Sequence, residues 1–356
     1  METTTLVSRL PLALVVATAI VAGCGGTAVS PVPSAVPSSA QSAPVSPSPA
    51  PASSSPSLAS PAPATSWVPN LKVKRLQPLG LLAADGSLWI AEHHSGRLLR
   101  VDPANGTVQA TITGLGDEAQ VPFAAGGQVW IASSDELQAV DTKTNKIVRS
   151  IPGSFSFNGV EAGGRIWIGN GNDALLEIDP TNGSVLKTIP ANGLATGGED
   201  CLNTVAAGDG AVWWSVNALG EVLTVDPASA TITGDVGHLG GVNYVAVGPD
   251  RVWVKGNDGL IRTIDPASHA VTATYPVNNP ALSNCAGIVD VDGSTVWILD
   301  DTDFNHVYRL DAAKGKVTGY FDPGDTDIQA MLVVDHSVWL TFYDTGYVDR
   351  YSPPSP

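Results

Sequence analysis

The sequence predicts an all-β fold, a seven-bladed β-propeller with four antiparallel strands per blade, on three observations. A unit anchored on a tryptophan recurs every 37 to 46 residues after residue 66. An aspartate follows that tryptophan by 11 to 14 residues in the first six units, and Ser352 takes its place in the seventh. No window shows sustained helical periodicity, so the folded part is expected to lack helices, and strand repeats of this length are typical of propellers. The anchors are Trp89, Trp130, Trp167, Trp213, Trp253, Trp297 and Trp339, and the aspartates are Asp102, Asp141, Asp179, Asp226, Asp265 and Asp311.

Each unit carries the signals of four strands in a fixed order. In the first unit a short apolar run ends at the turn pair Asp85-Gly86, and an alternating run then passes through Trp89. A polar loop, a run of the form L-x-x-[VI]-D, the turn PANG and the run TVQATI complete the unit. Because side chains alternate along a strand, the repeated tryptophans are expected to pack between blades. Trp67 and Trp214 stand outside the repeat position, and Trp214 is expected to face the opposite neighbour from Trp213.

The two ends of the repeat region predict how the ring closes. The seventh unit stops after its third strand, while LKVKRLQPLG at residues 71–80 aligns with TVQATITGLG, the outer strand and exit of the first unit. Residues 67–77 are therefore expected to form the outermost strand of the last blade. Such pairing removes the last open edge in the ring.

The first 66 residues differ in composition from the repeats. A polar lead and a short apolar run over residues 1–23 predict a signal peptide, because the run is too short for a membrane-spanning helix. Residues 25–66 contain no charged residue and are rich in Pro, Ser and Ala, which favours an extended, disordered tether. At about 3.1 Å per residue, such a tether reaches roughly 130 Å. We therefore divide the chain into a signal peptide (1–23), a tether (24–66) and a propeller (67–356).

The end of the apolar run bears on localisation. Val-Ala-Gly-Cys at residues 21–24 resembles the lipobox of bacterial lipoproteins. The resemblance implies cleavage before Cys24, lipidation of its thiol, and a protein anchored to the cell membrane on the extracellular or cell-wall side. An ordinary secretory signal with an incidental cysteine is the alternative.

The repeat itself resembles a known superfamily. The pattern [VI]-W-[IV] followed by L-x-x-[IV]-D-P-x-[TS] is similar to YVTN-type and virginiamycin B lyase-like seven-bladed propellers over residues 67–353. That superfamily includes a metal-dependent lyase that opens a cyclic depsipeptide antibiotic, and many exported proteins that bind partners. The resemblance specifies a fold more strongly than a function, because propellers support unrelated activities.

One face of the predicted ring collects the variable loops. The loops after the tryptophan strands and the connectors into the innermost strands should share that face, and the two longest connectors span residues 189–203 and 275–287. Insertions on a rigid scaffold often carry binding. These connectors hold Cys201 and Cys285, a candidate disulfide outside the cytoplasm. Blade five lies between them, so two unreactive thiols remain the main alternative, with a metal site as a third.

The same face carries the residues that suggest catalysis. Glu92 and His93 follow Trp89, and WIAEHH resembles the W-F-T-E element of the lyase-like repeats. A carboxylate beside an imidazole could move a proton or bind a metal, with Asp300 and His306 as partners from the sixth unit. Most units lack a carboxylate at the position of Glu92, which favours a solvated polar loop, and binding of a ligand without catalysis is a third possibility.

The loop of the sixth unit also suggests a divalent cation, calcium or magnesium. Asp301, Asp303 and Asn305 alternate as oxygen ligands do at the start of a calcium-binding loop. The glycine and the distal glutamate of that motif are missing, since His306 and Ala312 occupy their positions. No other cofactor motif was found.

Charge narrows the range of partners. The chain has a net charge of −16, and its one basic cluster is Lys72, Lys74 and Arg75, which excludes nucleic acid as a partner. We expect a monomeric, membrane-tethered propeller that acts as a binding scaffold for a protein or small-molecule ligand. The alternative is a lyase-like or hydrolytic enzyme with a metal-assisted site at the central mouth.

Overall fold

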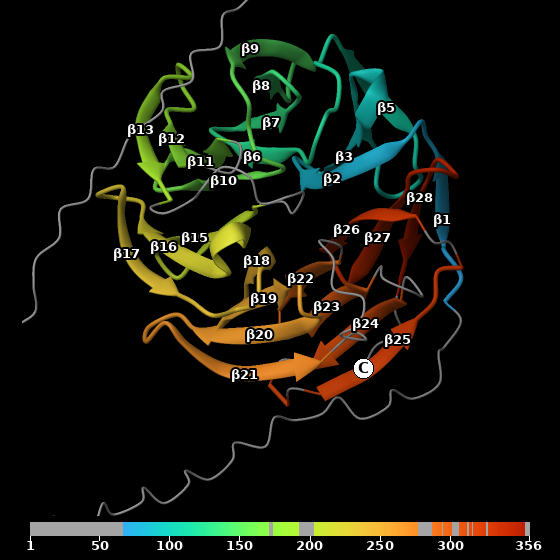
Figure 1. The fold of residues 1–356 in the computed structure, drawn as a ribbon. Helices are drawn as coiled ribbons and strands as arrows, with labels where there is room; N and C mark the ends of the chain where they lie inside the picture. The colour runs from blue at the N-terminus through green and yellow to red at the C-terminus, as the bar shows by residue number, and fades with distance from the viewer. Residues whose placement is uncertain are drawn as a thin grey trace, which may run out of the picture. The chain divides into compact units, whose positions relative to one another are not determined.

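The computed structural model describes residues 67–170, 174–191, 203–276, 287–293, 295–300, 306–311, 313–314, 316–324 and 327–352. All of these residues belong to the unit formed by residues 53–356. Within this part of the chain, seven four-stranded antiparallel sheets are arranged as blades around a central axis (Figure 1). The predicted all-β, seven-bladed propeller is confirmed.

The blades follow the chain in order, and each begins with its innermost strand. Blade one contains β2 (Pro78–Ala84), β3 (Ser87–Glu92), β4 (Arg97–Val101) and β5 (Val108–Thr113). Blade two contains β6 (Phe123–Ala125), β7 (Gln128–Ala132), β8 (Glu136–Asp141) and β9 (Lys146–Pro152). Blade three contains β10 (Gly159–Ala162), β11 (Arg165–Asn170), β12 (Ala174–Ile178) and β13 (Val185–Pro190). Blade four contains β14 (Val205–Gly208), β15 (Ala211–Val216), β16 (Glu221–Asp226) and β17 (Thr231–Val236). Blade five contains β18 (Val242–Val247), β19 (Val252–Gly256), β20 (Leu260–Asp265) and β21 (Ala270–Pro276). Blade six contains β22 (Ile288–Asp292), β23 (Thr295–Asp300), β24 (His306–Asp311) and β25 (Lys316–Phe321). Blade seven contains β26 (Ile328–Val334), β27 (Ser337–Phe342), β28 (Tyr347–Tyr351) and β1 (Leu71–Lys74).

The ring closes with the N-terminal strand, as the sequence predicts. Strand β1 pairs antiparallel with β28, with Leu71 opposite Arg350. Before that strand, the Trp67 ring stacks on Phe321 at 4.3 Å between centroids and meets Trp297 edge-on at 5.8 Å. Trp67 thereby packs against the core between blades six and seven. The N-terminal segment is thus held in blade seven by strand pairing and against blade six by aromatic packing.

The repeated tryptophans form the cores between neighbouring blades. All seven have exposed fractions between 0 and 3%. Trp213 packs in the core shared with blade five, whereas Trp214 packs in the core shared with blade three. The prediction from strand alternation is therefore confirmed for this adjacent pair.

The repeated aspartates organise the turns before the outer strands. Asp226, for example, accepts the backbone N–H of Ala228 at 2.9 Å and the hydroxyl of Ser229 at 2.8 Å. These hydrogen bonds lower the pKa of Asp226, because they stabilise the carboxylate. The turn ends in a residue with positive φ, such as Ala230 at 51°, and a β-bulge follows in blades one to six. Bulges twist the exposed outer edges and so discourage pairing with another chain.

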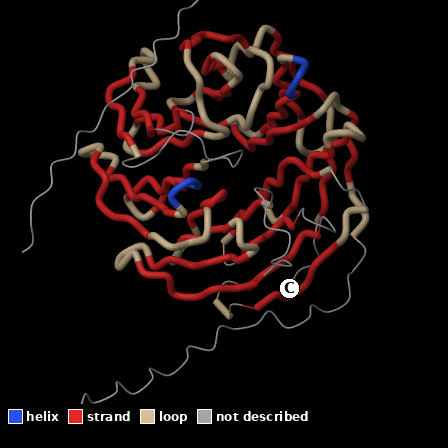
Figure 2. The backbone as a smooth tube through the Cα atoms, viewed as in Figure 1, coloured by secondary structure: helices blue, strands red, loops and turns tan. Residues whose placement is uncertain are grey.

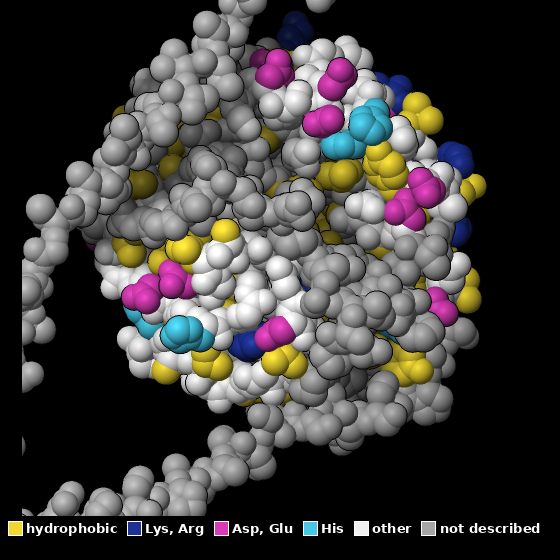
Figure 3. Space-filling model, viewed as in Figure 1, with side chains coloured by type: hydrophobic (Ala, Val, Ile, Leu, Met, Phe, Trp, Pro, Cys, Tyr) yellow, Lys and Arg dark blue, Asp and Glu magenta, His cyan; other side chains and the backbone are white. Residues whose placement is uncertain are grey.

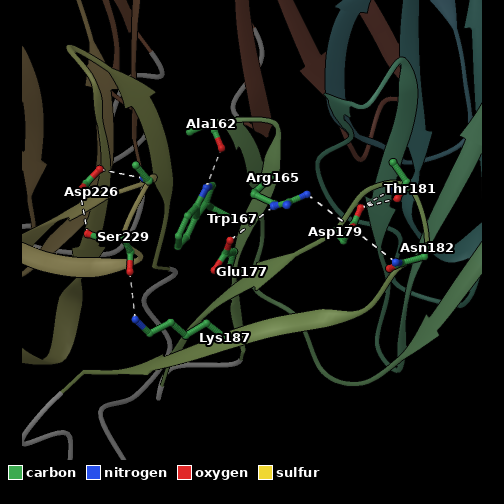
Figure 4. A network of polar contacts seen from close by, with 11 residues as sticks. Ala162, Arg165, Trp167, Glu177, Asp179, Thr181, Asn182, Lys187, Asp226 and Ser229 are labelled. Carbon is green, nitrogen blue, oxygen red and sulfur yellow. Dashed lines mark hydrogen bonds and ion pairs between the residues drawn. The ribbon is translucent and has the colours of Figure 1, made fainter.

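Basic side chains on several blades reach the turn of the next blade. Figure 4 shows Lys187 of blade three directed at Ser229 of blade four, where its Nζ donates to the carbonyl at 3.3 Å. Arg350 of blade seven donates to the Pro103 carbonyl of blade one at 2.6 Å and to Asn70 Oδ1 at 2.8 Å. Corresponding bonds run from Arg100 to Thr142 at 2.5 Å and from Arg149 to Thr181 at 2.6 Å. Charged donors thus link successive blades at their rims.

Two short helical turns qualify the expectation of a helix-free fold. The 3₁₀ turns η1 (His93–Ser95) and η2 (Asn217–Leu219) follow the second strands of blades one and four (Figure 2). Both end at a glycine with positive φ, Gly96 at 58° and Gly220 at 64°, which permits the chain to reverse within three residues. Among the residues described, no helix has the length and apolar character needed to cross a membrane.

Candidate functional site

The strand order gives the propeller two distinct faces. We call the loop face the one that carries the loops between second and third strands, residues 93–96, 133–135, 217–220, 257–259 and 343–346, together with the connectors between blades. The turn face carries the tight turns between first and second strands and the turns before the outer strands. Figure 2 shows η1 and η2 on the face nearest the viewer, and Figure 3 shows histidine and acidic side chains on the same side. The sequence-predicted site residues of blades one and six lie at this end of their strands.

Glu92 is a structural residue of the ring closure. Its exposed fraction is 1%, and it forms an ion pair with Arg97. Its Oε1 accepts the backbone N–H of Leu76, just beyond the closing strand, at 2.9 Å, and its Oε2 accepts the Ser95 hydroxyl at 3.3 Å. The expectation of a solvated loop is wrong for this side chain, because the chain leaving β1 covers it.

One tautomer of His93 is favoured at the rim of the loop face. Its Nδ1 lies 3.1 Å from the carbonyl oxygen of Ala119, which can only accept, so this contact favours the neutral tautomer with the proton on Nδ1 and the lone pair on Nε2. The His94 ring lies 4.4 Å from the His93 ring, and Tyr343 of blade seven packs edge-on against both at 6.1 and 6.3 Å. We call His93, His94 and Tyr343 the imidazole–tyrosine cluster. Burial raises the pKa of Tyr343, with a smaller contribution from neighbouring carboxylates.

Asp300 and His306 lie in blade six, with blade seven between them and Glu92. They are opposite each other in the β23–β24 pairing. The His306 ring packs edge-on against Tyr320 of the outer strand at 5.0 Å and against Tyr308 at 6.0 Å.

Other predicted site residues cannot be placed. The side chain of Asp300 and the whole of Cys24, Cys201, Cys285, Asp301, Asp303 and Asn305 lie outside the described residues. The candidate lipidation, disulfide and cation sites therefore stay predictions. In the part of the chain that is described, no group of three or more histidine, cysteine or acidic side chains could hold a metal ion.

A second polar group on the loop face was not anticipated from the sequence. We call Asn203, Asn217, Asn243 and Asn257 the amide cluster, which spans blades four and five. Asn203 Oδ1 accepts the backbone N–H of Asn217 at 2.8 Å, and Asn217 Nδ2 donates to Asn243 Oδ1 at 2.5 Å. Asn257 Nδ2 reaches Asn217 Oδ1 at 3.5 Å. The available signal was positional, since Asn217 occupies in η2 the place that His93 occupies in η1.

Asp290 is a further buried carboxylate on an innermost strand. Its Oδ2 accepts the backbone N–H of Val333 in blade seven at 2.8 Å, and its Oδ1 accepts that of Val291 at 2.8 Å. By surface area the residue is half-buried, yet protein closely surrounds the carboxyl, and this burial raises its pKa to about 6. The carboxyl links two blades at the cost of being desolvated.

Comparisons with known proteins agree with this architecture. A family model described as the outer membrane protein assembly factor BamB matches residues 65–189. No curated protein matches the sequence. Virginiamycin B lyase from Staphylococcus aureus superposes with a TM-score of 0.66 at 15% identity, over 80% of this chain and 98% of that one. The Cps50 (Swd1) propeller domain of Myceliophteria thermophila gives 0.64 at 11% identity, over 80% and 99%. BamB from Moraxella catarrhalis gives 0.56 at 15% identity, over 77% and 84%.

These structures match about four fifths of this chain, whereas the family model matches only residues 65–189. At such low identity, a shared structure establishes the fold and leaves the activity open. The fold implied by the lyase-like sequence pattern is confirmed. The chain is a seven-bladed β-propeller that shares its fold with virginiamycin B lyase and BamB.

Proposed function

We propose that the protein is a membrane-tethered, extracytoplasmic scaffold that binds its partner through the loop face. The proposal rests on the contacts that Glu92 makes within the protein. Its carboxyl is buried, paired with Arg97 and bonded to Leu76, so its contacts stabilise the closed ring and its oxygens are not presented to a substrate. Among the described residues, the loop face otherwise presents two clusters of polar and aromatic side chains suited to recognition.

Two clusters on that face supply the recognition chemistry. The imidazole–tyrosine cluster joins blades seven and one, and the amide cluster joins blades four and five. Aromatic rings bury area at low entropic cost, and amides offer both donors and acceptors. Asn203 and Asn243 are buried, so Asn217 and Asn257 are the amides of the cluster that a partner could contact. A net charge of −16 favours a neutral or cationic protein or small molecule over an anion.

We propose that residues 1–23 are a signal peptide and residues 24–66 the tether, with Cys24 as the lipidated first residue of the mature chain. Strand β1 begins at the turn face, because Leu71 pairs with Arg350 near the end of β28. Before β1, Trp67 stacks on Phe321 of blade six, so a tether would join the propeller at its outer edge, between blades six and seven.

Expression of the full chain in bacteria tests both parts of this function. Cys24→Ser should move the protein from the membrane fraction to the medium and remove the lipid mass. A thermal-shift screen with cell-envelope fragments, cyclic peptide antibiotics and divalent cations should reveal a ligand, since about 2.7 kcal/mol is gained at 100 times the dissociation constant. His93→Ala or Asn217→Ala should weaken the shift, and Ser229→Ala on the turn face should not. A shift that is equal in all variants would exclude the loop face.

A lyase-like or hydrolytic enzyme is the second candidate, favoured by the tautomer of His93. An imidazole whose Nδ1 donates to a carbonyl keeps Nε2 as a base. In this alternative Asp300 and His306 would assist, with a calcium or magnesium ion bound near residues 301–305. Incubation with a cyclic depsipeptide antibiotic and a divalent cation should then yield a linear product, and His93→Gln should abolish its formation.

A further inference from the structure

A cavity lies on the turn face at the seam between blades one and seven. Its volume is about 280 Å³, and its walls include Ala84 and Leu88 from blade one and Val334 and Trp339 from blade seven. Leu88, Trp339 and Val334 also belong to the hydrophobic core between these two blades. The cavity is thus an outward continuation of an apolar core, at the place where the ring closes.

Two carboxylates belong to the lining of this cavity, one from each blade. Asp85 and Asp335 occupy the same position, the first residue of the turn between first and second strands, and both have φ of 49°. Both residues are exposed, and among the described residues neither forms an ion pair. The Ser87 hydroxyl, by contrast, is already engaged by Arg100 and Gln109. The guanidinium of Arg350 also lies at this seam, 5.4 Å from the centroid of the Trp339 ring, and donates to the Pro103 carbonyl. The seam therefore combines apolar walls with two carboxylates that form no ion pair among the described residues.

The indole of Trp339 supplies a donor at the same place. In blades one to four the corresponding indole N–H donates to the carbonyl five residues earlier, at 3.0 to 3.4 Å. Within the described residues Trp339 makes no such bond, although Val334, the residue five positions earlier, lines the cavity beside it. Its exposed fraction is 2%, so the unbonded N–H belongs to a nearly buried ring. An ammonium group has no lone pair to accept this N–H, so Trp339 would contribute to the site only as an apolar wall.

We propose that this cavity binds an aliphatic ammonium group, the chemistry shared by a free alkylamine and a lysine side chain. The apolar walls would cover the methylenes, each of which is worth about fourfold in affinity when buried. Asp85 and Asp335 would pair with the ammonium, and the same carboxylates repel anions. The volume lies just below the range of about 300 to 1,000 Å³ found for drug-sized ligands, which fits a ligand of a few atoms.

Calorimetric titration of the full-length protein tests the proposal with matched probes. Pentylamine should bind saturably, and its neutral isostere N-pentylacetamide should bind about three- to tenfold more weakly, since two exposed ion pairs are lost. Nα-acetyl-lysine amide separates the two sources of the group. Binding as tight as that of pentylamine indicates a lysine of a peptide, and much weaker binding indicates a free amine. Equal binding of pentylamine and N-pentylacetamide would overturn the proposal.

Substitutions locate the site. Asp85→Asn and Asp335→Asn should each weaken pentylamine about two- to fivefold, and asparagine tolerates the positive φ of both positions. Asp209→Asn is the matched control, because Asp209 holds the same turn position in blade four with φ of 51° and lies outside the cavity lining. Ala84→Leu should fill the cavity and abolish binding while the protein still unfolds cooperatively. An equal loss in Asp209→Asn would refute the site, since it would assign the effect to overall charge. None of these outcomes depends on whether the loop face binds a partner, because the cavity lies on the turn face.

Discussion

Replacing Asp290 with asparagine should remove a pH-dependent destabilisation from the contact between blades six and seven. Burial raises the pKa of Asp290 from its ordinary value of 3.8 to about 6. The folded protein therefore holds this proton more tightly than the unfolded chain does. As pH rises from 4 to above 6, the folded state must either keep the proton or ionise a desolvated group, so the free energy of unfolding falls over that range.

The size of the effect follows from the two pKa values. One pKa unit corresponds to about 1.4 kcal/mol, so the ionised carboxyl destabilises the folded state by up to about 3 kcal/mol relative to its protonated form. Asparagine cannot ionise, and its side-chain oxygen can still accept the Val333 N–H that joins the two blades. The stability of Asp290→Asn relative to the wild type should therefore increase by up to about 3 kcal/mol between pH 4 and pH 7.

Urea unfolding at pH 4, 5, 6 and 7, followed by tryptophan fluorescence, measures this difference directly. Taking the difference between the two proteins cancels the titration of groups that do not interact with Asp290. Asp292→Asn on the same strand is the matched control, because Asp292 pairs with a histidine, His336, that is 92% exposed. Its relative stability should change by less than about 1 kcal/mol over the same range. A constant difference between Asp290→Asn and the wild type would refute the raised pKa and the burial argument behind it.

Three further predictions concern ring closure and the turns. Trp67→Ala should lower the free energy of unfolding by about 3 kcal/mol, because the stacked ring between blades six and seven is lost, whereas Val68→Ala, at an 80% exposed position, should have little effect in the same urea titration. Arg350→Ala should cost about 1.5 to 3 kcal/mol, because its bonds to Pro103 and Asn70 are lost, and an unchanged urea midpoint would contradict their role in closure. The lowered pKa of Asp226 contributes stability that is present above about pH 4 and lost as pH falls through that pKa. The melting temperatures of the wild type and Asp226→Ala should therefore converge at acid pH, and a gap that persists at pH 2 would count against the turn bonds.

Much of the fold could be predicted because its signals are local. The tryptophan repeat, the alternation that separates Trp213 from Trp214, and the aspartate turns each depend on residues within one blade. The closing strand could be predicted as well, since residues 71–80 resemble the outer strand of the first unit. The sequence predicted a fold without helices, and the described residues contain no α-helix. The prediction missed the 3₁₀ turns η1 and η2, because three residues are too few to show a periodic pattern.

The candidate site was less predictable, because side-chain roles depend on neighbours that are distant in the chain. Glu92 looked like an exposed acid beside two histidines, and only the path of the closing strand past it makes it a buried partner of Arg97 and Leu76. The amide cluster draws its members from two blades, and no local motif marks it.

The sequence by itself determined the repeat, the number of blades and the strand that closes them, because alternation and turn chemistry act over a few residues. The tertiary structure alone decided which charges are buried, shared or left without an ion pair. Asp290 accepts a hydrogen bond from Val333, which lies 43 residues later in the chain. Asp85 and Asp335 line the same cavity although 250 residues separate them. The free energy of a charge depends on what surrounds it in space, and only the closed ring brings those surroundings together.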